Sequence, residues 1–578
     1  MSFLGIDVGG TFTDAVLLDG GELRTAKVPT ATQQEESVVA AARAVGAEQL
    51  DRFTHGTTVA TNALLERKGA RTAFVATAGF EHVLHLRRQN RAHLYRLCAD
   101  HPEPLVPLER CFGVRERIGP DGVLEPLDLD SLPELDAEAV AVCTLFSFRD
   151  PSHERAVADE LRRRMPGARV VASHEVSPEF REYERASTTA VDAYLGPVVS
   201  SYLERLAVAC KSAGLPEPLV MRSSGGVATV LEAAAHPSWA LVSGPAAGVV
   251  GAELVARLAG RRDAISFDMG GTSTDVCLIA GGSTVRSAER SVAGLPVRLP
   301  TVDLQTVGAG GGSIVWRDAG GALRVGPESA GADPGPACYG RGGTRPTVTD
   351  ANLLLGRLPD RLAGGLELHR AAAERALEGI DPHAVIAAVN AEMLRALRLV
   401  SVERGYDPRG FALVAFGGAG PLHACELAEE LGIETVLVPD AAGVLSALGL
   451  VASDERRDHV RSYVCPLADA GELPGEGDAD LRYRGQSFEL TVPLGPRLVE
   501  RFHGAHEERY GYADSEREIE LVAVRTADVR RGPEIRLPPG EPIEAAGPRL
   551  VELSGATCWL PPGWVGARDG GTLTLTKA

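Results

Sequence analysis

One eight-residue pattern occurs twice in the chain and constrains its fold more than any other feature. Residues 7–14 read DVGGTFTD and residues 268–275 read DMGGTSTD, so six of eight positions are identical in copies that lie 261 residues apart. An apolar run precedes and follows each copy, which is typical of strands in a buried sheet. Two strands joined by a short glycine-containing loop predict a β-hairpin. The chain is therefore expected to contain two related halves.

The loops of these hairpins have the composition of a phosphate-binding turn. Glycine lets the backbone approach a ligand closely, and successive N–H groups in a tight turn attract anions. The threonine hydroxyls add donors, and an aspartate at a strand end is suited to hold Mg²⁺, or its waters, beside phosphates. Either copy alone could be an ordinary hairpin. Together they favour two acidic phosphate loops that face each other across a cleft.

Two competing phosphate-binding motifs do not fit. The chain has no G-x-x-x-x-G-K-[ST] sequence. Its paired glycines are followed by a strand rather than by the helix that a dinucleotide-binding fingerprint needs. Residues 306–313, which read TVGAGGGS, are either a hinge or a backbone cradle. The strand-like run that follows them favours the cradle.

A further glycine turn lies late in the chain. A buried strand is expected over residues 411–416, followed by the turn GGAGPLH and a helix over residues 424–431. A strand, a glycine turn and a helix N-terminus together suit adenosine and its adjacent phosphate. Alone this pattern is weak, but it follows two phosphate hairpins in chain order.

A hydroxyl-rich turn follows the first hairpin. Residues 53–62 read FTHGTTVATN, and they lead into a helix that is expected from residue 63. His55, Thr57, Thr58 and Asn62 could line the substrate side of a cleft. The alternative from chemistry alone is a capped helix start with a structural histidine.

Composition excludes several classes of partner. The net charge of −19 argues against nucleic acid and anionic membranes, although a local loop can still bind ATP. The nine cysteines include no C-x-x-C pair, which is typical of free thiols in a reducing cytosol. No apolar run reaches the roughly 18 residues of a membrane span, and the first strand is expected near residue 3, so we expect a cytoplasmic protein without a signal peptide. Lysine is nearly absent, which we attribute to the codon bias of a G+C-rich, bacterial genome.

The remaining patterns predict an α/β fold with several domains. A strand, helix and strand over residues 137–172 give a βαβ rhythm and a mostly parallel sheet. From about residue 465 the chain changes to short alternating strands with Pro/Gly-rich turns, which predicts a small β-rich domain. The expected division is residues 1–180 for an N-terminal lobe, 181–460 for a core with the second hairpin and the adenosine turn, and 465–578 for the C-terminal domain.

Two phosphate hairpins and a late adenosine turn resemble the actin/sugar-kinase/Hsp70 ATPase superfamily. That resemblance implies two RNase H-like α/β lobes with ATP between them. Within it, the chain is similar to the hydantoinase A/5-oxoprolinase family, which includes N-methylhydantoinase A subunits and the related acetone and acetophenone carboxylase subunits. The similarity spans nearly the whole chain. It is carried by residues 9–14, 55–71, 173–202, 243–252, 268–275, 306–313, 335–358 and 416–424.

The family resemblance implies an activity. ATP would phosphorylate the carbonyl oxygen of a cyclic amide, such as a hydantoin or 5-oxoproline, and a hydantoinase B-type subunit would complete ring-opening hydrolysis. The implied assembly is a hetero-oligomer in which this chain uses ATP and Mg²⁺. One alternative is an acetone or acetophenone carboxylase subunit that phosphorylates the enolate oxygen of a ketone. Another, of a different class, is a non-catalytic nucleotide switch.

The resemblance also implies roles by position. His55 becomes a candidate catalytic residue, with Thr57, Thr58 and Asn62 on the substrate side. Gln305 stands where many relatives have histidine, and the chain is shorter than typical members. The remaining implied roles are Asp7 and Asp268 for catalysis and Mg²⁺, and Gly9, Gly10, Thr11, Thr13, Asp14, Gly270, Gly271, Thr272, Asp275, Gly417, Gly418 and Gly420 for the nucleotide.

Overall fold

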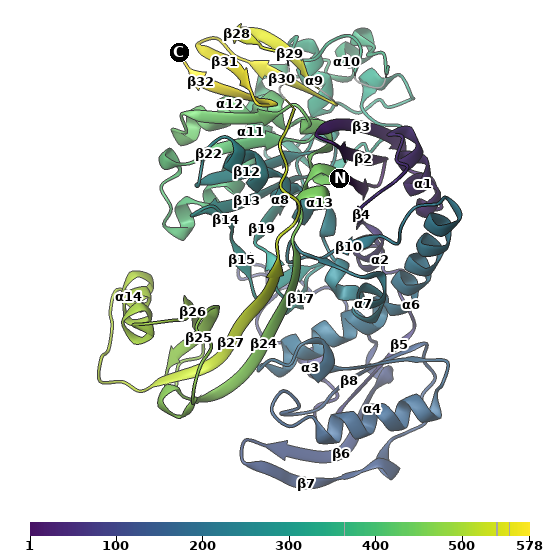
Figure 1. The fold of residues 1–578 in the computed structure, drawn as a ribbon, viewed down its shortest axis with the longest axis vertical. Helices are drawn as coiled ribbons and strands as arrows, with labels where there is room; N and C mark the ends of the chain where they lie inside the picture. Colours follow the sequence, from purple (N-terminus) through teal and green to yellow (C-terminus); the bar gives the residue numbers. More distant parts are fainter. Residues whose placement is uncertain (363–364, 539–540, 554) are drawn as a thin grey trace.

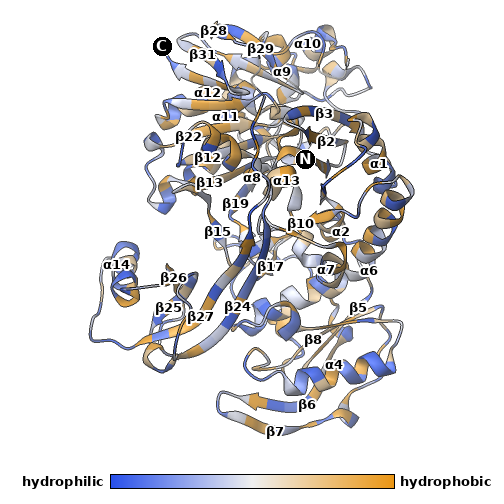
Figure 2. Ribbon diagram, in the orientation of Figure 1, coloured by the Kyte–Doolittle hydropathy of each residue, from blue (hydrophilic) through white to orange (hydrophobic). Residues whose placement is uncertain are grey.

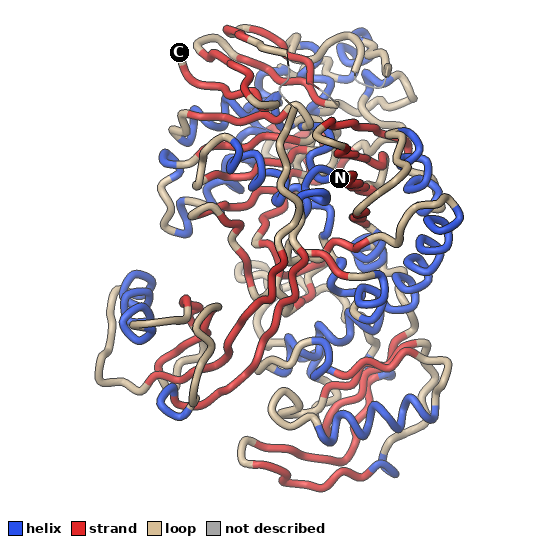
Figure 3. The backbone as a smooth tube through the Cα atoms, in the orientation of Figure 1, coloured by secondary structure: helices blue, strands red, loops and turns tan. Residues whose placement is uncertain are grey.

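The structure is a computed structural model that describes residues 1–362, 365–538, 541–553 and 555–578 (Figure 1). It is a mixed α/β protein built on three large sheets with helices between and around them (Figure 3). In the part of the chain that is described, no helix is long and apolar enough to cross a membrane.

The first large sheet contains the N-terminal hairpin. Its strand order is β26-β25-β27-β24-β11-β10-β4-β1-β2-β3. The bounds are β1 Ser2–Val8, β2 Phe12–Asp19, β3 Glu22–Pro29, β4 Arg52–Thr57, β10 Leu219–Met221, β11 Val227–Ala228, β24 Glu455–Pro466, β25 Asp478–Tyr483, β26 Leu490–Pro493 and β27 Ile519–Arg530.

The second large sheet contains the second hairpin. Its order is β14-β13-β12-β22-β23-β32-β31-β28, and β19 pairs with β13. The bounds are β12 Ala264–Met269, β13 Thr274–Ala280, β14 Ser283–Thr284, β19 Leu304–Val307, β22 Ala412–Phe416, β23 Thr435–Pro439, β28 Glu544–Ala546, β31 Trp564–Asp569 and β32 Thr572–Lys577.

The third sheet is mostly parallel, as the βαβ rhythm predicts. Its order is β7-β6-β5-β8-β9. Strand β5 is parallel to β6 and β8, and β8 is parallel to β9, whereas β7 is antiparallel to β6. Helix α4 (Ser152–Arg164) connects β8 to β9. The bounds of the strands are β5 Thr72–Thr77, β6 Cys111–Gly119, β7 Gly122–Asp128, β8 Ala139–Cys143 and β9 Arg169–Ala172.

Helices α8 (Ser243–Leu258) and α13 (Leu445–Ala452) lie between the two large sheets (Figure 1). They pack closely because glycine leaves room: a Cβ built on Gly449 would lie 1.9 Å from the Ala247 carbonyl oxygen. On the strand side, a Cβ on Gly5 would lie 2.1 Å from the Ala447 carbonyl oxygen. Helix α13 is strongly hydrophobic in Figure 2, whereas the ribbon strand β24 is largely hydrophilic. Helices α8 and α13 thus form a closely packed layer between the two large sheets.

The C-terminal region differs from the expectation of a separate β-rich domain. Strand β27 pairs with β24 and extends the first sheet, while β32 pairs with β23 and extends the second. The short alternating strands after residue 465 were expected to form their own sheet, but β24 and β23 offer unpaired backbone groups that these strands satisfy. The wing of β25, β26, β27 and α14 (Leu498–Tyr510) has a small core of its own, and it projects from the body in Figure 1.

Candidate functional site

The first hairpin is formed by β1 and β2. The antiparallel register places Asp7 opposite Asp14, and Asp14 opposite Lys27 on β3. Residues directly opposite each other share a face of the sheet. The three side chains therefore form a charged row across β1, β2 and β3, and Lys27 makes an ion pair with the Asp14 carboxylate.

The loop of the first hairpin closes tightly and leaves its tip open. The Gly9 N–H donates to the Phe12 carbonyl at 3.0 Å. Gly10 and Thr11 are exposed at the tip, and a Cβ built on Gly10 would meet nothing within 4 Å. Thr13 is fully buried, and its hydroxyl is 3.0 Å from that of Thr30, so the structure places it behind the loop rather than in the open space.

The second hairpin, formed by β12 and β13, repeats this geometry. Asp268 lies opposite Asp275, and the Gly270 N–H donates to the Ser273 carbonyl at 3.0 Å. Gly271 and Thr272 are exposed at its tip.

The glycine run at residues 310–312 lies directly against the second loop. The N–H groups of Gly311 and Gly312 donate to the carbonyls of Gly270 and Gly271 at 3.0 and 2.7 Å. A Cβ on Gly310 would lie 2.7 Å from the Thr272 nitrogen, so only glycine permits this approach.

The carboxyl groups of the two hairpins lie within electrostatic reach of each other. Burial, then repulsion from Asp14, raises the pKa of Asp7 to about 7, while Lys27 lowers it. Burial, then repulsion from Asp275 and Asp7, raises the pKa of Asp268 to about 8. Each carboxyl group disfavours ionisation of the other. A cation placed between the hairpins would relieve this repulsion.

Glycines also crowd the two leading aspartates. A Cβ on Gly56 would lie 2.5 Å from Asp7 Oδ1, and one on Gly417 would lie 2.3 Å from Asp268 Oδ1. Within the described residues, the buried Asp7 Oδ1 has no hydrogen-bond partner. Helix α8 begins beside it, since a Cβ on Gly244 would be 3.3 Å from the same oxygen. The site therefore has an unsatisfied carboxylate oxygen next to a helix N-terminus.

These residues fit a magnesium ion better than an all-protein metal cage. Mg²⁺ is usually held by one or two carboxylates, with water and substrate phosphates as its other ligands. The orphaned Asp7 oxygen and Asp268, whose carboxyl group lies within electrostatic reach of Asp7, provide such a pair. Over residues 1–362, 365–538, 541–553 and 555–578, no cluster of three or more His, Cys, Asp or Glu side chains could hold a metal.

The late glycine turn lies beside the second hairpin. Strand β22 pairs with β12 so that Phe416 faces Asp268. Gly417 has φ +77°, and the Ala419 N–H donates to the Met269 carbonyl at 2.9 Å. Gly418 is exposed, and helix α12 begins at Gly420, four residues earlier than the sequence predicts. The second hairpin and the late glycine turn, which are far apart in the sequence, thus meet at the carboxyl ends of the neighbouring strands β12 and β22.

His55 is fully buried behind the first hairpin. Its Nδ1 lies 3.2 Å from the Ile6 carbonyl and must donate to it, so Nε2 accepts from the Tyr202 hydroxyl at 2.8 Å. Burial lowers the pKa of His55 to about 4, which keeps the ring neutral at pH 7. Both ring nitrogens are engaged, and this geometry favours a positioning role over proton transfer to a substrate.

The other residues of the hydroxyl-rich turn surround the start of helix α2 (Val59–Leu65), which begins earlier than predicted. Thr57 is buried, and its carbonyl accepts from the Ser243 hydroxyl at 2.8 Å. Thr58 has a buried hydroxyl without a hydrogen-bond partner among the described residues. Asn62 is partly buried on α2. Thr57 is thereby tied to the first turn of α8, next to Asp7.

Sequence reasoning missed the cations beside the second aspartate of each hairpin. Lys27 pairs directly with Asp14. In the second copy, Thr306 donates to Asp275 Oδ1 at 2.5 Å and receives a hydrogen bond from Arg290 at 3.0 Å. Lys27 could have been noticed as one of very few lysines, but Arg290 is one of many arginines.

Comparison with known proteins gives consistent matches over most of the chain. Residues 3–165 match the family model described as Hydantoinase/oxoprolinase N-terminal region, and residues 185–459 match Hydantoinase/oxoprolinase. Caprolactamase subunit alpha of Pseudomonas jessenii is 35% identical over 97% of this chain and 90% of that protein. The crystal structure of the ATP-dependent caprolactamase from the same organism covers all of both chains, with a TM-score of 0.88 at 33% identity.

Two further relatives differ in how much of their length is matched. Acetophenone carboxylase gamma subunit of Aromatoleum aromaticum is 36% identical over 77% of this chain and 67% of that protein. 5-oxoprolinase 1 of Arabidopsis thaliana is 33% identical over 79% of this chain, but only 42% of that protein is covered.

Proposed function

The chain belongs to the hydantoinase/oxoprolinase family, and from that premise we propose that it is the ATP-using subunit of an enzyme that opens cyclic amides. The observation that carries the proposal is the pair of acidic glycine hairpins whose carboxyl groups lie within electrostatic reach. The match to an ATP-dependent caprolactamase over the whole chain supports this assignment.

In this proposal the two hairpins bind the triphosphate. The exposed tips at Gly10–Thr11 and Gly271–Thr272 direct backbone N–H groups toward phosphate oxygens, and the turn at residues 417–420 supports adenosine. The proposal places the nucleotide between two RNase H-like lobes, one around each hairpin. The boundary between these lobes differs from the expected division at residue 180, because β10 and β11 (residues 219–228) belong to the same sheet as β1 and β4. A Cβ built on Gly418 would meet nothing within 4 Å, so the surface at this turn is open.

The acidic residues are proposed to hold the metal. Mg²⁺, when bound, would offset the negative charge that accumulates during phosphoryl transfer. Asp7 and Asp268 would hold it. The residue packed against each carboxylate is a glycine, which has no side chain to cover it, and Asp7 keeps an unsatisfied oxygen. Lys27 supplies a further positive charge beside the first loop.

The reaction balances as three steps. The amide oxygen attacks the γ-phosphorus, a new P–O bond forms, and the P–O bond to ADP breaks. One water then adds to the activated carbon and the C–N bond breaks, which releases the amine and leaves an acyl phosphate. A second water cleaves the acyl phosphate to a carboxylate and phosphate. We assign Thr57, Thr58 and Asn62 to the substrate side, since they surround the helix start next to Asp7. A hydantoinase B-type partner would complete hydrolysis, and relatives named as alpha and gamma subunits support a hetero-oligomer.

A second candidate is a subunit of a ketone carboxylase. The acetophenone carboxylase gamma subunit favours it, because its identity of 36% is close to the 35% of the caprolactamase subunit. The same hairpins would then transfer phosphate to the enolate oxygen of a ketone. The two candidates differ in their substrate and in their need for bicarbonate.

The test is substrate-stimulated ADP release by the complex purified with its own partner subunit. Hydantoin, 5-oxoproline and caprolactam are compared with acetone plus bicarbonate. We expect a cyclic amide to stimulate turnover, and Asp268→Asn to lower it about 100-fold because charge stabilisation in the site is lost. Asp159→Asn, an exposed substitution on α4, is the matched control. Stimulation only by ketone with bicarbonate would replace the first candidate by the second.

A further inference from the structure

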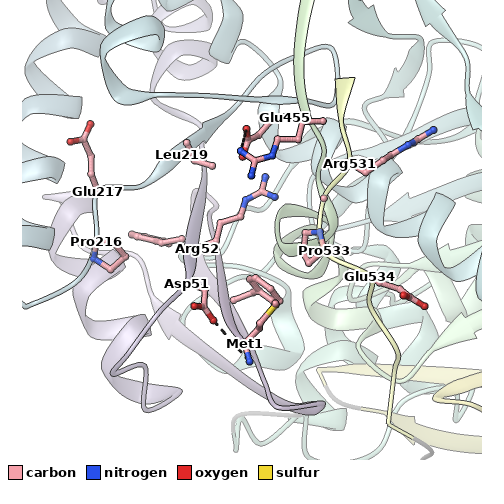
Figure 4. Close-up of a pocket in the computed structure, with 14 residues that line it drawn as sticks. Met1, Asp51, Arg52, Pro216, Glu217, Leu219, Glu455, Arg531, Pro533 and Glu534 are labelled. Carbon is pink, nitrogen blue, oxygen red and sulfur yellow. Dashed lines mark ion pairs between the residues drawn. The ribbon is translucent and has the colours of Figure 1, made fainter. Parts of the chain in front are cut away.

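The cavity in Figure 4, about 570 Å³ in volume, lies at the end of β1 and β4 opposite the first hairpin loop. Arg52 and Arg531 line it together with the carboxylates of Asp51 and Glu455, and Glu455 offsets the charge of Arg52. The lining therefore favours neither an anion nor a cation. A more specific arrangement of polar side chains lies behind the late glycine turn.

His423 is the fourth residue of helix α12 (Gly420–Leu431), which begins at the late glycine turn, and it is fully buried. Its Nδ1 lies 2.7 Å from Asn390 Oδ1 on helix α11 (Pro382–Val400). The Nδ2 of the same amide donates to the Glu426 carboxylate at 2.8 Å, which fixes the orientation of the amide. Nδ1 of His423 therefore donates, and its Nε2 is left as an acceptor.

Asn352 of helix α9 (Val348–Leu354) provides the donor for this acceptor, because its Nδ2 lies 3.3 Å from Nε2 of His423. The buried Asn352 Oδ1 then has no hydrogen-bond partner among the described residues, which costs stability. A polar pair kept at such a cost is better explained by the position that it specifies. Burial, and then repulsion from Arg357, lowers the pKa of His423 to about 3, so the ring stays neutral at pH 7.

Helix α9 is also bonded to the glycine run beside the second hairpin. Thr349 donates from its backbone N–H and from its hydroxyl to the Gly311 carbonyl, at 2.8 Å in each case. Gly311 in turn donates to the Gly270 carbonyl of the second loop at 3.0 Å. Because residues three apart lie on one face of a helix, the same side of α9 holds Thr349 and Asn352. Helix α9 thus connects the second loop to His423.

We propose that His423 is a positioning residue for the nucleotide: through Asn352 and helix α9, it fixes the late glycine turn relative to the second phosphate loop. The inference rests on the proposed function, because that function assigns adenosine to the turn and phosphate to the loop. His423 is fully buried, so it acts through the turn rather than by contact with the ligand. A ligand that contacts both elements depends on their relative position, whereas a ligand that contacts only the loop does not.

The test compares two probes with the full-length chain by calorimetry in the presence of Mg²⁺. A non-hydrolysable ATP analogue contacts both elements, and tripolyphosphate contacts only the phosphate loops. We expect His423→Leu to weaken the ATP analogue roughly tenfold, about 1.4 kcal/mol, and to leave the affinity for tripolyphosphate unchanged. Leu397→Ala, a destabilising substitution in the buried face of α11, is the control and should leave both affinities unchanged.

Two amide substitutions separate the two hydrogen bonds of the ring. His423→Gln places an amide near the position of Nε2 and keeps the contact with Asn352, whereas His423→Asn places it near Nδ1 and keeps only the contact with Asn390. We expect His423→Asn and Asn352→Leu to weaken the ATP analogue roughly tenfold, and His423→Gln no more than about threefold. Both amide variants keep a polar side chain, so they remain informative where His423→Leu fails to fold.

The outcomes distinguish the inference from the proposed function. Equal losses in the two amide variants, or equal weakening of tripolyphosphate and the ATP analogue, would overturn the positioning role. If the wild type binds neither probe, the proposed function fails and the inference fails with it. If the wild type binds the ATP analogue and shows amide-stimulated ADP release, but His423→Asn and Asn352→Leu bind the analogue equally well, only the inference fails.

Discussion

The two hairpins have the same turn but different neighbours. In the first, the residue opposite the closing aspartate is Lys27, which pairs directly with Asp14. In the second, that position is Thr306, which relays a hydrogen bond from Arg290 to Asp275. Positive charge therefore reaches the first hairpin directly and the second through a hydroxyl group. A repeated motif can thus keep its backbone while its charge balance diverges.

The strands behind the hairpins differ in the same way. Ile6 of the first hairpin is paired across the sheet with His55, whereas Phe267 of the second is paired with Ala415. The strand next to the first hairpin therefore has a hydrogen-bonded histidine at this position, and the strand next to the second has a buried alanine. This difference suggests which substitutions should separate the roles of the two copies.

The largest effect is expected for the leading aspartates. Asp7→Asn and Asp268→Asn should each lower amide-stimulated ATP turnover by about 100-fold, because each removes a charge proposed to hold the metal beside the phosphates. ADP release at saturating substrate measures this loss. If one variant retains near wild-type turnover, the two copies are not equivalent in holding the metal.

The buried histidine should produce a stability effect that only the first copy shows. The folded pKa of His55 is about 4, below the value of 6.5 for an ordinary histidine, so the unfolded chain binds the proton first as pH falls. Its contribution to stability is present above pH 6.5 and is lost between about pH 6.5 and pH 4. Relative to His55→Gln, the wild type should lose about 3 kcal/mol of unfolding free energy over this range.

Urea unfolding at several pH values measures this difference. His82→Gln, at an exposed position, is the control. A wild type and a His55→Gln variant with parallel pH profiles would contradict the buried, neutral ring. ATP turnover of the same variant at pH 8 would test the earlier interpretation of His55 as catalytic. If His55 only positions other groups, His55→Gln should lose much less turnover than Asp7→Asn.

The sequence indicated the hairpins because each copy repeats identical residues at a spacing that local rules can interpret. It also placed the turn at residues 417–420, because the glycines follow a buried strand. The duplication itself favoured two Asp-led loops that face each other across a cleft, and the resemblance to a known family supported it, although the copies lie 261 residues apart. The comparisons confirm the family, while the assigned site residues stay predictions.

Other features depended on long-range pairing. Strands β27 and β32 both lie within the predicted C-terminal domain, but they extend two different sheets by pairing with β24 and β23. Arg290 lies 15 residues from Asp275 and is connected to it by hydrogen bonds through Thr306. No periodic pattern in the sequence predicts this contact. The hydroxyl-rich turn left open whether His55 lines a cleft or is a structural histidine, and its position in the centre of a sheet decides its burial.

Lys27 and Arg290 should differ in their effect on nucleotide affinity. Lys27→Met is expected to weaken nucleotide binding about tenfold, as expected for the loss of one charge-assisted contact, and Arg290→Gln by about two- to threefold because its charge is relayed. Calorimetry with a non-hydrolysable nucleotide measures both, with Lys68→Met as an exposed control. Equal effects of the two variants would show that the difference in neighbours has no consequence for the ligand.

The smallest effect on stability is expected at the loop tips. A Cβ on Gly10 or Gly271 meets nothing within 4 Å, and neither glycine has a positive φ, so alanine at either position should change the unfolding free energy by less than about 0.5 kcal/mol. The same methyl group should weaken nucleotide binding several-fold, because it occupies space proposed for phosphate.

By contrast, Gly417→Ala should be strongly destabilising, since its Cβ would lie 2.3 Å from Asp268 Oδ1. Thermal unfolding and nucleotide titration of the three variants separate the two effects. If Gly10→Ala and Gly271→Ala bind nucleotide as the wild type does, the open tips do not face the phosphates, and the pairing of the hairpins would need a different explanation.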